Sequence, residues 1–158
     1  MNIPPTERTG FRVSSVDDLL VLVASGPTSP ADMSWLEGRA QEFAVPRPGR
    51  AVYLHHVPKG TEQRLPDEET RTAMQRFMRN ASVNYVAAAL VLDVAGFFGA
   101  AMRSLFSGLI LIARPSIPVK TFATVAEARV WLARLSPASR LPNEAALSAA
   151  LAELEPKR

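Results

Sequence analysis

The sequence predicts an α/β fold, in which helices cover a mixed, mainly parallel five-stranded sheet. Short segments rich in β-branched and aromatic residues alternate with longer segments whose apolar residues recur at helical spacing. From Phe11 onward the predicted order is β-β-α-β-α-β-α-β-α, and one further helix follows. Because parallel neighbours need connections of helix length, this alternation predicts parallel central strands. The 158 residues, 47% of them hydrophobic and 21% charged, suffice for one globular core.

The first half of the chain shows clear element boundaries. "FRVSS" and "LLVLVAS" flank residues 16–18, which predicts a hairpin between two strands. Ser29 before Pro30 is typical of a helix start, and we expect a helix over Pro30–Ala44. "AVYLHHV", Ala51–Val57, has the composition of a strand. Pro66–Asn80 is then strongly amphipathic, which predicts a helix.

The least polar stretch is "AALVLDVAGFFGAAMRSLFSGLILIARP", Ala88 to Pro115. The window Val83–Met102 is long enough to cross a membrane. Asp93 lies at its centre, where a carboxylate costs about 2.5–3.5 kcal/mol. We therefore expect no transmembrane span, but a buried strand ending near Asp93, a turn at Gly96 and an apolar helix.

The C-terminal part begins with a short strand in "IPVKTFA". Thr124 and Glu127 form a capping-box pattern that predicts a helix to about Leu135, with Trp131 buried. A terminal helix follows, with an apolar stripe of Leu147, Leu151 and Leu154. We expect a flexible arm at residues 1–10, an α/β domain at 11–136, and a linker with a C-terminal helix at 137–158.

The helix after Gly96 is apolar around most of its circumference, although a helix on a sheet needs only one apolar face. The terminal helix, a second subunit or a lipid-like ligand could cover the excess. A protein partner, most simply a second copy, is one expectation, and the candidate interface residues are Phe97, Phe98, Met102 and Phe106.

The composition excludes several classes of site. Without cysteine the chain has no disulfide, no cysteine-based zinc site and no cysteine nucleophile. It has no long basic run of the kind that binds nucleic acid. No residue pattern predicts a catalytic set, a cofactor or a metal. The N-terminus lacks an apolar signal region, so we expect a cytoplasmic location.

His56 and Asp93 are the candidate ligand-binding residues, because ligands bind outside the carboxyl ends of parallel strands. Since neighbours on a strand face opposite sides, His55 and His56 cannot both face one site. A surface histidine, with Asp93 capping the next helix, is the alternative. The GxxG at Gly96–Gly99 lacks the other residues of a phosphate-binding loop, so we expect it to be structural.

The order of elements and the C-terminal third carry a family resemblance. "VAAALVLDVAGFFGAAMRSLFSGL" followed by "PVKTFATVAEARVWLARL" resembles the SpoIIAA-like group of the STAS and SEC14-like superfamily. Those proteins typically close with a buried strand, a helix, a "V-x-x-F" strand and a helix ending "A-x-x-W-L". The corresponding segments here are Val119 to Phe122 and Ala128 to Leu132, and the resemblance covers roughly Phe11–Leu135.

The resemblance implies a non-enzymatic regulatory or protein-interaction domain acting through an apolar helix surface. Many STAS domains are controlled by phosphorylation in a motif resembling Asp-Ser-Ser-Gly. This chain has "PKGTEQRLPDEETRTAM" there, and neither Thr61 nor Thr70 sits in that motif, so no phosphosite is carried over. The alternatives are a carrier of a small or lipid-like ligand, or a small enzyme with its site near His56 and Asp93.

Overall fold

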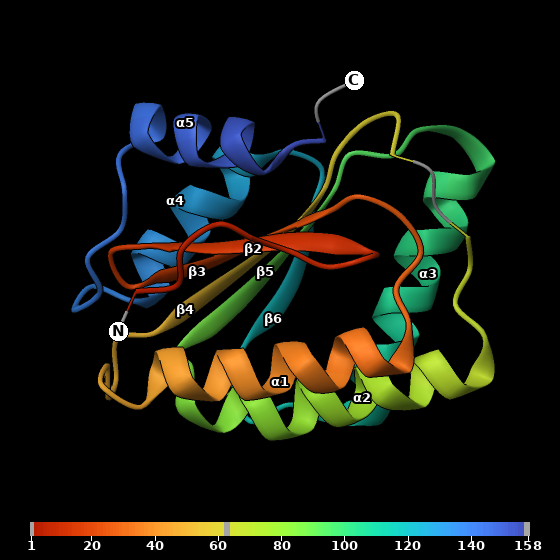
Figure 1. The fold of residues 1–158 in the computed structure, drawn as a ribbon, viewed down its shortest axis with the longest axis horizontal. Helices are drawn as coiled ribbons and strands as arrows, with labels where there is room; N and C mark the ends of the chain where they lie inside the picture. The colour runs from red at the N-terminus through yellow and green to blue at the C-terminus, as the bar shows by residue number, and fades with distance from the viewer. Residues whose placement is uncertain (1, 62–63, 157–158) are drawn as a thin grey trace.

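The computed structural model describes residues 2–61 and 64–156 and shows a six-stranded mixed sheet with helices on both faces (Figure 1). The strand order across the sheet follows the chain, β1 to β6. The α/β class is confirmed, but the sheet has one strand more than the predicted five. Its strands are β1 (Thr6–Glu7), β2 (Phe11–Val16), β3 (Leu19–Ala24), β4 (Val52–Val57), β5 (Ala87–Leu92) and β6 (Val119–Phe122).

The additional strand lies in the segment predicted to be a flexible arm. Thr6 and Glu7 pair antiparallel with β2. Ile3 is buried, and its backbone N–H donates to Ser15 Oγ at 2.7 Å. Sequence patterns do not predict this strand, because it follows two prolines and only two of its residues pair, which is too few to show an alternation of apolar and polar residues.

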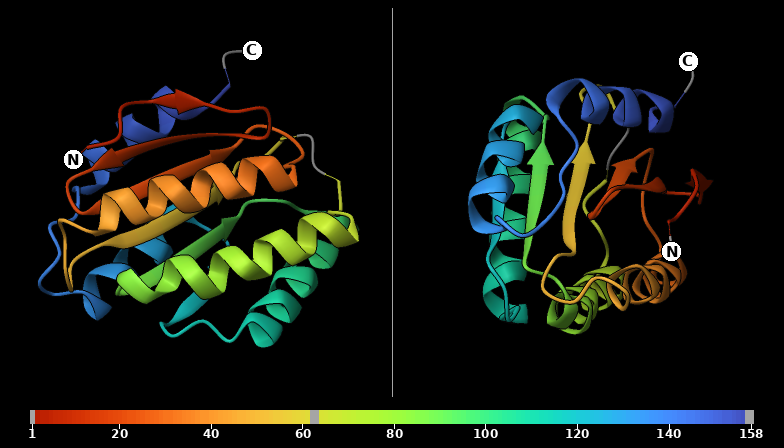
Figure 2. Two further views of the ribbon diagram at one scale, coloured as in Figure 1. Left: turned by 60° about the horizontal axis from the view of Figure 1, so that its bottom comes forward. Right: turned by 90° about the vertical axis from the view of Figure 1, so that its left-hand side faces the viewer.

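The hairpin β2–β3 is antiparallel, and the pairs β3–β4, β4–β5 and β5–β6 are parallel. Right-handed crossovers that keep adding strands in one direction put their helices on one face of a sheet. Accordingly the three crossover helices share one core with the sheet, and two of them lie side by side in Figure 2. These helices are α1 (Pro30–Ala44), α2 (Glu68–Ala81) and α3 (Gly96–Ala113).

The opposite face carries α4 (Val125–Leu135) and α5 (Glu144–Leu154). Alternation along β3 separates the two cores, with Leu20 and Leu22 facing α1–α3 and Val21 facing α4–α5. The predicted stripe on the terminal helix is buried as expected: Leu147, Leu151 and Leu154. Because α5 packs on β2 and β3, it does not cover α3, and that explanation of the apolar helix is wrong.

The predicted helix starts are confirmed at two sites. Ser29 caps α1 in a capping box with Asp32, and Thr124 accepts from Glu127 N at the start of α4. The helix predicted from Pro66 begins two residues later, because the Asp67 side chain accepts from Thr70 N and acts as the N-cap.

The junction between β5 and α3 depends on its two glycines. Gly96 has a φ of +73°, which side-chain-bearing residues rarely adopt. A Cβ at Gly99 would lie 1.9 Å from the Val94 carbonyl oxygen. The GxxG is therefore structural, as predicted, and it lets the helix start directly against the preceding turn.

Helix α3 buries one side only. Met102 and Phe106 are 3% and 4% exposed and belong to the core, while Phe98 is partly buried against it. Phe97 is 92% exposed. The predicted interface of these four residues is thus wrong for Met102 and Phe106, because the helix turns them toward the sheet.

By length and composition α3 could cross a membrane, and 28% of its residues are buried inside the protein. Core helices of soluble proteins can have the same length and composition, and α3 connects two parallel strands of one sheet. The window Val83–Met102 is not one helix, since it holds β5 and only the start of α3.

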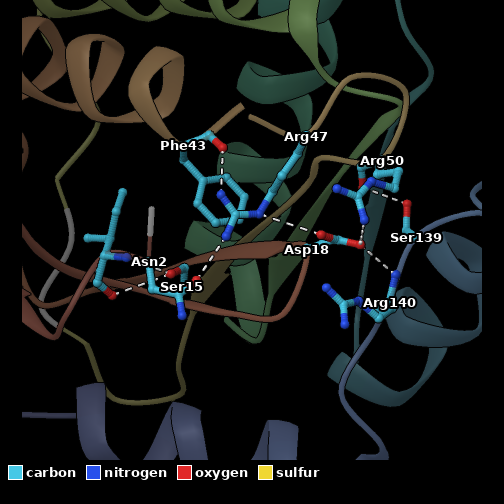
Figure 3. A network of polar contacts seen from close by, with 9 residues as sticks. Asn2, Ser15, Asp18, Phe43, Arg47, Arg50, Ser139 and Arg140 are labelled. Atoms are coloured by element: carbon cyan, nitrogen blue, oxygen red, sulfur yellow. Dashed lines mark hydrogen bonds and ion pairs between the residues drawn. The ribbon is translucent and has the colours of Figure 1, made fainter. Parts of the chain in front are cut away.

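A buried polar network lies where β2 turns into β3, at the end of the sheet where the parallel strands begin (Figure 3). Asp18 is 2% exposed, 3.5 Å from Arg47 Nε and 3.8 Å from Arg50 Nη1. Arg140 N donates to Asp18 Oδ2 at 2.8 Å, and Arg47 Nη2 donates to Asn2 Oδ1. The network joins the hairpin to the segments before β4 and α5, which is a structural role.

Candidate functional site

A cavity of about 380 Å³ opens at the carboxyl ends of β3 and β4. Its wall comes from the β3–α1 loop, the segment preceding α2, the first turn of α2 and one side of α3. Polar side chains of Ser29, Arg64, Asp67 and Thr70 line it together with apolar ones. This is the end of a parallel sheet at which α/β proteins bind ligands.

A second, smaller space of about 60 Å³ lies between the sheet and all three crossover helices. Its lining is mostly apolar and includes Leu36, Phe77 and Leu90. The outer and inner spaces share four lining residues, Thr28, His55, Met74 and Phe106. The two spaces are therefore adjacent chambers, an outer one of mixed polar and apolar lining, called the mouth, and an inner one that is mostly apolar.

His55 lies at the junction of the two chambers. Its Nδ1 is 3.5 Å from the Tyr53 hydroxyl, and its ring meets Phe106 edge-on at 6.3 Å between centroids. Burial, and secondarily the neighbouring His56, lowers the pKa of His55 to about 4. The imidazole is consequently uncharged at neutral pH and offers a hydrogen bond without a charge.

The charges at the mouth are of both signs. The Thr70 backbone and side chain hydrogen-bond to Asp67 and lower the pKa of this exposed carboxyl, which keeps it ionised. Arg64 lies on the same rim and is also exposed. Neither rim charge belongs to the lining of the inner chamber.

His56 and Asp93 lie outside this cavity. His56 faces the α4–α5 side of the sheet, where it is 8% exposed and its Nδ1 is buried without a hydrogen-bond partner. Burial lowers the pKa of His56, while the nearby charges of Glu155 and Asp93 act in the opposite direction. Asp93 is exposed, and its backbone N–H donates to the Val57 carbonyl. No hydrogen bond or ion pair joins the two side chains in the described part of the chain.

The alternative role for Asp93 also differs from the structure. Ala95 occupies the N-cap of α3, and no side chain caps that helix. Asp93 therefore neither caps α3 nor lines the chambers.

Sequence reasoning selected His56, which is the histidine of the pair that does not line this cavity. Alternation predicts that one of the two faces the crossover helices, but it does not say which one. The register of β4 decides this, since Tyr53 and His55 point toward Phe77 and Phe106. Tyr53, two residues away and aromatic, was the signal that could have pointed to the His55 face.

Comparisons with known proteins do not assign the chain. It matches no protein-family model, and neither a curated protein nor a solved structure matches it. Within residues 2–61 and 64–156, no three histidine or acidic side chains gather closely enough to hold a metal ion.

Proposed function

We propose that this chain is a non-enzymatic binding domain that holds a small, largely apolar ligand in the two-chambered cavity. The observation that carries the proposal is the set of lining residues common to both chambers, which places a mostly apolar space directly beside the mouth at the strand ends. Burying apolar ligand surface there contributes about 25 cal/mol per Å². A cavity lined mainly by apolar groups with few polar ones is the usual form of such sites.

The chemistry of the lining favours binding over catalysis. Histidines in acid–base catalysis are commonly held by a carboxylate within hydrogen-bond distance. In the described part of the chain the side-chain hydrogen-bond neighbour of His55 is the Tyr53 hydroxyl, and burial raises the pKa of Tyr53. Both groups stay uncharged at neutral pH, so they can orient a ligand.

Filling the inner chamber should weaken ligand binding. Ala88 lines that chamber from β5 and is partly buried. In Ala88→Ile the added carbon atoms occupy the space that the apolar end of a ligand needs. Excluding about two methylenes of ligand should weaken binding of the fluorophore N-phenylnaphthylamine about tenfold. Fluorescence titration measures the change.

Ala133→Ile is the matched control, because Ala133 is exposed on α4 across the sheet. It should bind the fluorophore like the wild type. Unchanged affinity in folded Ala88→Ile, or no binding by the wild type, would contradict the proposed function.

A second candidate function, a regulatory interaction domain of the STAS-like kind, is favoured by the outer side of α3. Phe97, Ser104 and Leu111 are exposed and follow one another at seven-residue spacing, which puts them on one line along the helix. Ile112 beside Leu111 is 64% exposed. Phe97 and Leu111 lie equally far from Ser104, so a second copy crossing antiparallel at Ser104 would bring Phe97 against Leu111 of that copy.

Self-association through this surface should depend on Phe97. The Phe97→Glu variant would place a carboxylate where an apolar contact is expected. In sedimentation velocity at micromolar concentration, the variant should therefore sediment as a monomer. Because Phe97 is 92% exposed in the single chain, the unfolding midpoint should not change at concentrations low enough for the wild type to be monomeric. A wild type that sediments as a monomer at every concentration would exclude this second function.

A further inference from the structure

The chemical class of the ligand follows from the polar atoms that the two chambers present. The inner lining contains hydroxyl groups and one imidazole, and its described side chains carry no lysine, arginine or carboxylate. The charged groups of the lining, Arg64 and Asp67, belong to the outer chamber only. A charged ligand group placed at the junction would thus lose water without gaining a counter-ion.

His55 supplies the hydrogen bond at the junction. Its Nε2 has no hydrogen-bond partner in the described part of the chain, whereas its Nδ1 faces the Tyr53 hydroxyl. Across this 3.5 Å contact either the Tyr53 hydroxyl or Nδ1 can be the donor. Where the hydroxyl donates, the imidazole proton lies on Nε2, and a histidine that lines both chambers offers an N–H donor.

The charges around the mouth are balanced and give an anion no net attraction, because Arg64 and Asp67 both lie on its exposed rim. Asp32 is buried in the first turn of α1, next to Ser29 of the mouth. Asp32 is already paired with Arg8 at 3.2 Å, so that arginine is engaged away from the cavity lining. At both helix starts that face the mouth, one first-turn amide, Asp32 N in α1 and Thr70 N in α2, already donates to the helix's own cap side chain.

We infer that the Tyr53 hydroxyl donates to His55 Nδ1, and that the ligand is an uncharged, largely apolar molecule with a hydrogen-bond-accepting oxygen, such as a ketone or an ester, which accepts from His55 Nε2. A short apolar end occupies the inner chamber, the oxygen meets His55, and the remainder lies in the mouth. This inference rests on the proposed function, because it names the ligand class of the same cavity.

Competition between two ligands of equal chain length tests it. Methyl hexyl ketone and octanoate are titrated against bound N-phenylnaphthylamine at neutral pH. The ketone should compete about tenfold more tightly or better, since the carboxylate must lose its hydration at an uncharged site. In His55→Leu the ketone affinity should fall about threefold to tenfold, the change expected for one neutral hydrogen bond.

The adjacent histidine provides the matched control. His56 faces the other layer, so His56→Leu should leave the ketone affinity unchanged while making the same chemical change one residue away. Circular dichroism melts establish that both variants are folded. If His55→Leu is unfolded, His55→Gln, which keeps an uncharged donor, should retain the preference for the ketone.

Three results would overturn the inference: octanoate competing as well as the ketone, neither compound displacing the fluorophore, or an unchanged ketone affinity in His55→Leu. In each of these cases the fluorophore still binds, and the proposed function stands. Failure of the wild type to bind the fluorophore would instead contradict the proposed function itself.

Discussion

Replacing Asp18 with alanine is expected to lower the free energy of unfolding by about 3–5 kcal/mol, because it removes one partner of a buried ion pair. Asp18 is 2% exposed, and it faces Arg47, which is 9% exposed. It also accepts from the Arg140 backbone N–H (Figure 3). In the alanine variant the Arg47 guanidinium and the Arg140 backbone N–H both lose this carboxylate. Because the site is buried, water replaces the lost contacts only in part.

Urea unfolding followed by circular dichroism measures this loss. Asp17→Asn is the matched control, since Asp17 is exposed in the same turn and asparagine tolerates its φ of 53°. The control should stay within about 0.5 kcal/mol of the wild type. A loss below about 1 kcal/mol in Asp18→Ala would mean that the network contributes little to folding.

Replacing Trp131 with alanine should cost about 3–5 kcal/mol, the range for removing a large aromatic side chain from a core. Trp131 is 9% exposed in the core beneath α4 and α5. Its ring lies 5.3 Å from that of Phe122, between centroids, in a tilted arrangement. Removing the indole would leave a cavity between the helix layer and β6 that the neighbouring strand cannot close.

The change is measured by thermal and urea unfolding of the variant. Val130→Ala on the same helix is the control, because Val130 is 63% exposed and should contribute about 0.5 kcal/mol or less. If the two substitutions cost the same, the packing of α4 on the sheet would differ from the structure.

The two candidate functions use different sides of α3, one for a small ligand and the other for a second copy of the chain. Met102 and Phe106 line the cavity, whereas Phe97 and Leu111 lie on the outer side of the same helix. A variant on one side can therefore be tested without changing the other. This separation makes Ala88→Ile and Phe97→Glu independent tests.

Local features of the sequence were enough to predict most elements. Ser29 and Thr124 cap helices because their hydroxyls satisfy nearby backbone N–H groups, which is a property of a few neighbouring residues. The burial of Trp131 follows in the same way from the apolar stripe of one helix. Gly96 and Gly99 also act locally, because each serves a turn of only a few residues.

Features that depend on contacts between distant segments could not be read from the sequence. The pairing of Thr6 with Val13 needs the open edge of β2 rather than any pattern in the arm itself. The stripe on α5 predicted a buried face, but the sheet face that it covers depends on where the linker crosses. Likewise, the apolar circumference of α3 did not show that Phe106 would turn inward and Phe97 outward.

The candidate site divides in the same way. The sequence by itself determined that His55 and His56 face opposite sides, because side chains alternate along any strand. Only the tertiary structure decided that His55 meets the chambers between the sheet and α1–α3, while His56 is buried on the other side. The physical reason is that alternation is a property of the single strand, whereas the identity of each face is set by the helices that pack on the assembled sheet.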